Sequence, residues 1–169
     1  MRRGADRGSV ALEMALISPL LMIMFLGCFE VTQLVRVYMG LGVAANAVAD
    51  LVSRDTPDTA ANIIDACNGG RLVVAPFAGA NLTVAIASVT KKASTGALTV
   101  NWTDTSCGNP APIANPIALA TPLDTNPNDT VIIVLARYSY TASTSFLLAP
   151  RYSLSTMGFS RPRTAPPAN

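Results

Sequence analysis

The sequence predicts an α+β fold in which a long N-terminal helix is followed by a small helix and an antiparallel β-sheet. Three observations predict it. Residues 14–29 carry no charge and are nearly all apolar, residues 56–58 read Thr-Pro-Asp as the start of a second helix, and apolar residues alternate with polar ones in several segments beyond residue 81. The chain has 169 residues, which is enough for an anchor and one domain with its own core.

The N-terminal helix is long enough to cross a membrane. Residues 14–29 rise about 24 Å as a helix, and the apolar flanks on both sides extend this stretch to the length that spans a bilayer. We therefore predict a transmembrane helix over residues 9–36. Arg2, Arg3 and Arg7 precede it, and the preference of basic residues for the cytoplasmic side predicts a cytoplasmic N-terminus with the remainder of the chain in the periplasm.

Residues 37–55 are predicted to continue the helix outside the membrane. Up to residue 52 this segment contains no proline and has apolar residues at helical spacing. Gly40, Ala44 and Ala47 lie near one face, where small side chains permit close approach of another helix. The domain that follows is an equally suitable neighbour for that face, and the sequence leaves both alternatives open.

A cleaved secretory signal peptide is the alternative to a permanent helix. Its small-residue cleavage site would be Ala45-Asn46-Ala47. This site lies well beyond the apolar core, after Glu30 and Arg36, whereas signal peptidase sites follow their apolar region by only a few residues. The spacing therefore disfavours cleavage at this point.

An exported α+β domain is predicted over residues 56–163. A helix should begin at Thr56 as N-cap and Pro57 in the first turn, run to about Ala66 and stop by Gly69-Gly70. The strands are predicted from alternating or β-branched segments, and the first two should form a hairpin turning at Gly96; the four segments are residues 81–91, 98–102, 131–141 and 154–160.

Two further segments should lack regular structure. Residues 105–129 contain five prolines, which disrupt both helices and strands. Residues 164–169 are predicted to be a disordered tail. No internal repeat is evident along the chain.

The three cysteines differ in their surroundings. Cys28 ends the apolar run, while Cys67 and Cys107 lie in the polar remainder. In an oxidising compartment a disulfide between Cys67 and Cys107 would close a loop worth about 4 kcal/mol in the chain-entropy model. Two buried free thiols are the alternative.

Composition excludes several functions. The net charge is +2 with scattered basic residues, so a nucleic-acid partner is not expected. The chain has no histidine, which removes the usual general base and the commonest zinc ligand. Asp124 and Asp129 lie in a Pro/Asn-rich turn that is typical of a solvated loop rather than of a calcium site. We predict no enzyme activity, no catalytic residue, no metal and no cofactor.

The N-terminal motif resembles a known family. Gly8, then Ser9-Val10-Ala11-Leu12-Glu13, then an apolar helix, resembles the prepilin peptidase site of type IV pilin-like proteins. More narrowly, the stretch from Gly8 through Pro19 to Glu30 is similar to the TadE-like proteins of the tight-adherence (Tad) pilus system. Met14 replaces the aromatic residue that this family usually has after the glutamate.

The resemblance implies a pilin-like fold and a role in pilus assembly. Residues 1–8 would be a basic leader that a prepilin peptidase removes between Gly8 and Ser9. The mature chain would act as a minor pilin or pseudopilin that assembles or initiates a Tad pilus from the bacterial inner membrane. Its implied partners are sibling pilin-like subunits, the peptidase and the inner-membrane assembly platform.

Glu13 is the fifth residue of such a mature chain. A carboxylate in lipid costs about 2.5 to 3.5 kcal/mol at the centre of a helix and less near the interface. The α-amine of Ser9 would be largely protonated at neutral pH, so the amine of a neighbouring copy would offset this cost. Alternatively, Glu13 extends to the cytoplasmic surface on its own, since only about 6 Å of helix separates it from Ser9.

A second class of function fits the same sequence. The chain would then be a single-span membrane protein that is not cleaved, does not enter a filament, and uses its periplasmic domain for binding or adhesion. The two functions differ at the bond between Gly8 and Ser9, which is cut only in the first.

Overall fold

The computed structural model describes residues 5–54, 60–123, 126–144 and 149–162, with side chains from residue 10 in the first range and from residue 62 in the second. The chain divides into two compact units. We call Met1–Arg36 with Thr141–Tyr152 the helix unit, and Val37–Tyr140 with Ser153–Asn169 the sheet unit. The elements confirm the predicted α+β class: a long apolar helix, a small helix and a four-stranded antiparallel sheet.

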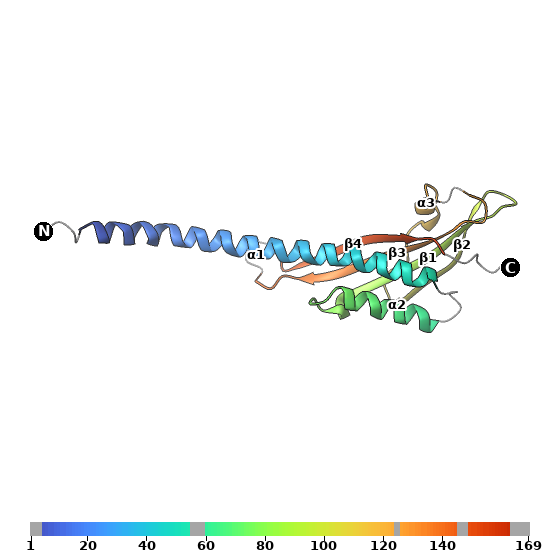
Figure 1. Ribbon diagram of the computed structural model, residues 1–169, viewed down its shortest axis with the longest axis horizontal. Helices are drawn as coiled ribbons and strands as arrows, with labels where there is room; N and C mark the ends of the chain where they lie inside the picture. Colours follow the sequence, from blue (N-terminus) through green and yellow to red (C-terminus); the bar gives the residue numbers. More distant parts are fainter. Residues whose placement is uncertain (1–4, 55–59, 124–125, 145–148, 163–169) are drawn as a thin grey trace. The chain divides into compact units, whose positions relative to one another are not determined.

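Helix α1 runs from Ala5 to Arg54 (Figure 1). Pro19 lies inside it; membrane helices tolerate proline because neighbouring groups satisfy the backbone carbonyl that loses its donor. Among the residues that the structure describes, one helix is long and apolar enough to cross a membrane, and this helix is α1. Its mean hydropathy is 2.1 over its most apolar window. Its length and composition indicate a single-pass membrane anchor.

Helix α2 spans Ala60–Val73, and its end corrects the prediction. The helix continues through Gly69 and Gly70, where we expected it to stop. A Cβ atom at Gly70 would lie 2.7 Å from Cγ2 of Val48 in α1, so the glycine permits the close approach of α2 to α1 that Figure 1 shows. The predicted start of this helix at Thr56 lies outside the described residues.

The four strands form one sheet in the order β2-β1-β3-β4. Strand β1 pairs antiparallel with β3, with Leu82 opposite Tyr138 and Thr90 opposite Thr130. The predicted hairpin between β1 and β2 is confirmed, and Gly96 in its turn has a φ of 66°, which favours glycine. The 3-10 helix η1 (Gly79–Asn81) precedes the strands, which are β1 (Leu82–Lys91), β2 (Leu98–Cys107), β3 (Thr130–Thr141) and β4 (Arg151–Ser160).

In the sheet unit, α1 and α2 pack on one face of the sheet. The hydroxyl of Ser53 at the end of α1 lies 2.9 Å from that of Ser160 in β4, and a Cβ at Gly70 of α2 would lie 3.6 Å from Leu82 in β1. The α1 side chains buried on this face recur at helical spacing; they are Val37, Leu41, Ala44, Ala45, Val48, Ala49 and Val52.

The second face of the sheet is covered by a segment that we expected to be irregular. Strand β2 continues to Cys107, and residues 116–120 form the short helix α3 (Pro116–Ala120), with proline at its start, where the missing N–H costs nothing. Ile113 and Ala120 are buried in a cluster with Val131 and Ile133 of β3. The apolar residues between the prolines therefore close the core on this side.

Candidate functional site

In the helix unit, α1 exposes apolar side chains around its whole circumference. Residues 20–25 are exposed without interruption, so no single face is covered. A helix that is apolar all round requires lipid or other helices as its surroundings. The exposed fractions range from 42% to 79% for Val10, Leu12, Met14, Leu16, Ile17, Leu20, Leu21, Met22, Ile23, Met24, Phe25 and Phe29.

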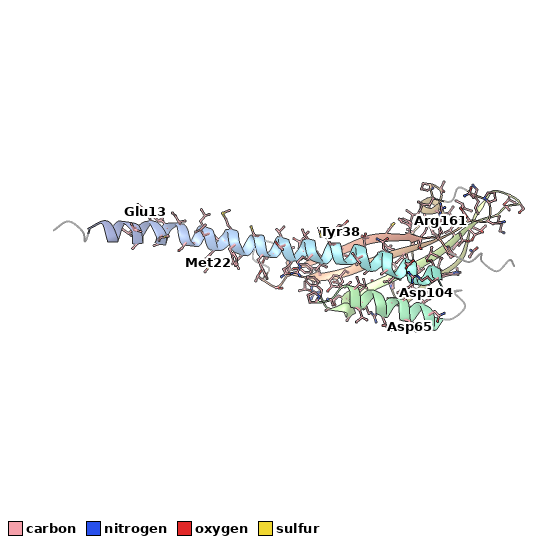
Figure 2. The ribbon with its side chains drawn as sticks, viewed as in Figure 1. Glu13, Met22, Tyr38, Asp65, Asp104 and Arg161 are labelled. Atoms are coloured by element: carbon pink, nitrogen blue, oxygen red, sulfur yellow. A yellow bond between two sulfur atoms is a disulfide. The ribbon has the colours of Figure 1, made fainter. Side chains whose placement is uncertain are left out.

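Glu13 lies on this apolar stretch. Its side chain is exposed and projects from the helix, as does that of Met22 (Figure 2). The backbone of Gly8 and Ser9 belongs to the same helix, which begins at Ala5. The backbone geometry therefore places the bond between Gly8 and Ser9 about one turn before Glu13 along one helix.

Glu30, at the other end of the apolar stretch, has different surroundings. Only 2% of its surface is exposed, and its carboxylate oxygen Oε1 accepts a hydrogen bond from the hydroxyl of Thr144, which lies between β3 and β4. In the sequence, Glu30 follows the apolar run directly, and no residue near it in the chain stands out as its partner. Thr144 is 114 positions away in the chain, so the local sequence around Glu30 does not indicate this partner. The signal in the sequence is the glutamate itself, because a carboxylate at the end of an apolar helix requires a polar partner.

In the sheet unit, α1 carries a second exposed surface. Tyr38, Met39 and Val43 are 54%, 65% and 60% exposed, and a Cβ atom at Gly40 or Gly42 would meet nothing within 4 Å. We call these five residues the outer face of α1. Figure 2 labels Tyr38 on it.

The small residues singled out in the sequence divide between the two predicted alternatives. Ala44 is fully buried against the sheet unit itself. Gly40 has open space beside it, and Ala47 is half-buried. One helix therefore packs on its own domain and leaves part of its surface available.

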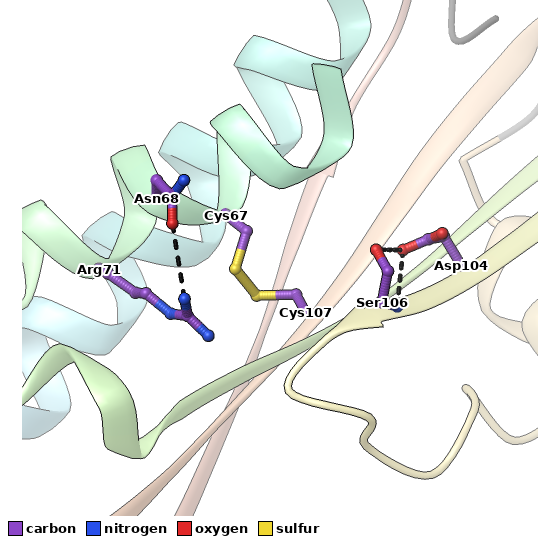
Figure 3. The surroundings of a disulfide bond; sticks show 6 residues. All are labelled: Cys67, Asn68, Arg71, Asp104, Ser106 and Cys107. Carbon is purple, nitrogen blue, oxygen red and sulfur yellow. Dashed lines mark hydrogen bonds between the residues drawn. A yellow bond between two sulfur atoms is a disulfide. The ribbon is translucent and has the colours of Figure 1, made fainter. Parts of the chain in front are cut away.

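Cys67 of α2 and Cys107 at the end of β2 form a disulfide in the structure (Figure 3), with a distance of 6.0 Å between their Cα atoms. Both residues are 3% exposed. The bond joins α2 directly to the sheet. Cys28 is a free cysteine and is exposed on α1.

Two buried tyrosines and Asp129 have structural roles. Tyr138 and Tyr140 are 3% and 4% exposed in the core, and the hydroxyl of Tyr138 donates a hydrogen bond of 3.2 Å to the carbonyl of Ala78. Asp129 accepts a hydrogen bond from Asn126 and lies 3.7 Å from Arg161. Asp124 lies outside the described residues, among which no cluster of three or more His, Cys, Asp or Glu residues is placed to hold a metal.

Comparison with known proteins finds a similarity in the N-terminal region. The family model described as TadE-like protein matches residues 8–50, which confirms the resemblance seen in the sequence and supports a protein associated with the Tad pilus. No curated protein and no solved structure matches the chain. The matched region contains the apolar stretch, Glu13, Glu30 and the outer face of α1.

Proposed function

We propose that the chain is a minor pilin or pseudopilin of a Tad pilus, cut after Gly8 by a prepilin peptidase and packed through α1 against sibling subunits. The mature protein would span the inner membrane, with its N-terminus cytoplasmic and the sheet unit periplasmic. The assembly platform in that membrane would receive it there. The role in this proposal is structural, as the similarity to TadE-like pilus proteins suggests.

The observation that carries this proposal is the family match over residues 8–50. The match begins at Gly8, the residue before the proposed cut, and covers nearly all of the helix that follows. An anchor alone requires only an apolar segment of sufficient length. The correspondence of the processing motif and the helix together favours a pilin-like subunit over an uncleaved anchor.

The outer face of α1 provides independent support. Tyr38, Met39 and Val43 are exposed at positions beyond Arg36, where the predicted membrane segment has ended. A simple anchor has no need of apolar side chains there, because water surrounds the helix once it leaves the bilayer. A neighbouring helix that packs against Gly40 and Gly42 would cover them.

Charge is consistent with lateral packing after processing. Removing residues 1–8 deletes three arginines and Asp6, which leaves nine basic and nine acidic side chains. The cut also frees the α-amine of Ser9, which is largely protonated at neutral pH. In lipid, the attraction between this amine and the carboxylate of Glu13 in a neighbouring copy would offset the free-energy cost of removing both charges from water. The two charges would therefore favour subunits packed in register.

The N-terminal residue of the protein in its native membrane tests the proposal. We expect sequencing or intact mass of the chain from the membrane fraction to show a start at Ser9, and deletion of the peptidase to restore the leader. An intact start at Met1 or Arg2 in cells that make the peptidase would instead support the uncleaved anchor with a binding or adhesion domain.

Replacing Glu13 tests the role of the charge. We expect Glu13→Ala to be cleaved normally but to enter assemblies roughly tenfold less, a loss equivalent to about 1.4 kcal/mol. The fraction that sediments with sheared pili or cross-links to sibling subunits measures this effect. Glu13→Gln keeps the size and removes the charge, so it should behave like Glu13→Ala. Normal incorporation of both variants would favour a glutamate that only reaches the cytoplasmic surface.

A further inference from the structure

A buried glutamate, Glu30, interrupts the exposed apolar surface of α1, which continues beyond it at Val31 and Val35. Residues 10–29 rise about 30 Å, which equals the thickness of the hydrocarbon core. Glu30 follows immediately, and the next charged residue along the helix is Arg36, which is exposed. If residues 10–29 occupy the hydrocarbon, Glu30 lies where the core meets the headgroup layer.

A distant segment of the chain covers the helix at this boundary. We call the described residues 141–144 and 149–152, which belong to the helix unit, the β3–β4 tip. The hydroxyl of Thr144 in the tip donates a hydrogen bond to the carboxylate of Glu30. The backbone N–H of Ala142 donates a hydrogen bond to the carbonyl of Pro150, which joins the two described arms of the tip. A carboxylate at the edge of the lipid requires such partners. With residues 10–29 in the hydrocarbon, this contact would place the tip at the bilayer surface.

The charge at this end of the helix unit is basic. Arg36 and Arg151 are both exposed, and residues 145–148, which lie outside the described residues, contain no charged side chain. Among the described residues from 30 to 36 and in the tip, the acidic residue is Glu30, and its side chain is buried and hydrogen-bonded. The chemistry that complements two exposed guanidinium groups beside a lipid boundary is that of phosphate-bearing lipid headgroups.

The geometry points to a second membrane contact: the β3–β4 tip is seated in the headgroup layer of the outer leaflet, where Arg36 and Arg151 bind lipid phosphates. The partner is the anionic bilayer that α1 spans. This contact fixes how deeply the helix sits and must break before the helix can leave the membrane. It requires α1 to span the bilayer and does not depend on cleavage or on filament entry.

Depth-dependent fluorescence quenching tests the contact in the full-length chain. Trp102 is the single tryptophan, so Trp102→Phe provides a silent background for Ser143→Trp in the tip and for Met22→Trp in the middle of the apolar stretch. Each variant is reconstituted into phosphatidylcholine vesicles with phosphatidylglycerol and a nitroxide on either the headgroup or the middle of the acyl chain. Circular dichroism melting verifies that each variant is folded.

We expect the headgroup label to quench most of the emission of Ser143→Trp, and the mid-chain label to quench Met22→Trp. Omitting phosphatidylglycerol from the vesicles should weaken the quenching of Ser143→Trp. Adding both Arg36→Gln and Arg151→Gln to that variant should remove this dependence on phosphatidylglycerol. Each arginine is expected to raise the docked population about fivefold. Lys91→Gln with Lys92→Gln, in the sheet unit, is the matched control and should retain it.

Quenching of Met22→Trp without quenching of Ser143→Trp would overturn the inference. So would emission of Ser143→Trp that responds to added sibling subunits but not to either lipid label, because the tip would then bind protein. Failure of the filament proposal is distinguishable, since an intact Met1 start leaves both quenching results unchanged.

Discussion

Replacing Cys67 and Cys107 together with alanine is expected to lower the free energy of unfolding of the sheet unit by about 4 kcal/mol. The disulfide closes a loop of sequence separation 40, and its loss returns conformational freedom to the unfolded chain. A domain of this size has only about 5 to 15 kcal/mol of net stability. The bond is therefore expected to decide whether the sheet unit tolerates further destabilisation.

Urea unfolding of the full-length chain in detergent measures this effect, with Trp102 as the intrinsic fluorophore of the sheet unit. The midpoint should fall by about 2 M for a slope of about 2 kcal/mol per M. Cys28→Ala, which removes the exposed free cysteine, should leave the midpoint unchanged. Reductant should move the wild-type midpoint to that of the double variant. A wild-type midpoint that does not respond to reductant would mean that the thiols are not joined.

The sequence predicted the elements with strong periodicity and failed where glycine and proline were ambiguous. Strands β1 and β3 are long and rich in β-branched residues, so their existence followed from local pattern. Gly69 and Gly70 resemble a helix stop, but α2 continues through them because Gly70 packs against Val48 of α1. That contact is tertiary and leaves no trace in the local sequence.

The functional site divides in the same way. Gly8 and Glu13 could be singled out from the sequence because they form a short motif with a fixed spacing. The family match confirms the resemblance that rests on this motif. The pairing of Glu30 with Thr144 joins residues 114 positions apart, so it required the packed chain. The cleavage, the role of Glu13 and the oxidation state of the cysteines in the cell stay predictions.

Gly158 occupies the point where β4 comes closest to α1 in the sheet unit. An added Cβ atom would lie 2.5 Å from the carbonyl oxygen of Ala45, 2.6 Å from its carbonyl carbon and 2.9 Å from the amide nitrogen of Asn46. All three are backbone atoms of a helix and cannot rotate away. A side chain here requires β4 to move off α1. Glycine within an alternating strand is a signal of such close backbone approach.

We expect Gly158→Ala to lower the free energy of unfolding by about 3 kcal/mol, the upper range for overpacking a core, and Gly158→Val to prevent stable folding. Moving β4 would also separate the hydroxyl of Ser160 from that of Ser53, now 2.9 Å apart. Urea unfolding followed by Trp102 fluorescence measures both variants, and protease sensitivity identifies a chain that does not fold.

Gly40→Ala and Gly42→Ala are the matched controls, because a Cβ atom at either position meets nothing within 4 Å. Alanine in a helix is favoured over glycine by about 0.8 to 1.0 kcal/mol, so these variants should be as stable as the wild type or slightly more so. A larger residue in place of glycine is therefore expected to lower the stability at Gly158 of β4, which packs on the covered side of α1. At Gly40 or Gly42, on the exposed side of α1, alanine is expected to leave the stability unchanged or to raise it. A Gly158→Val chain with the wild-type urea midpoint would show that β4 does not approach α1 this closely.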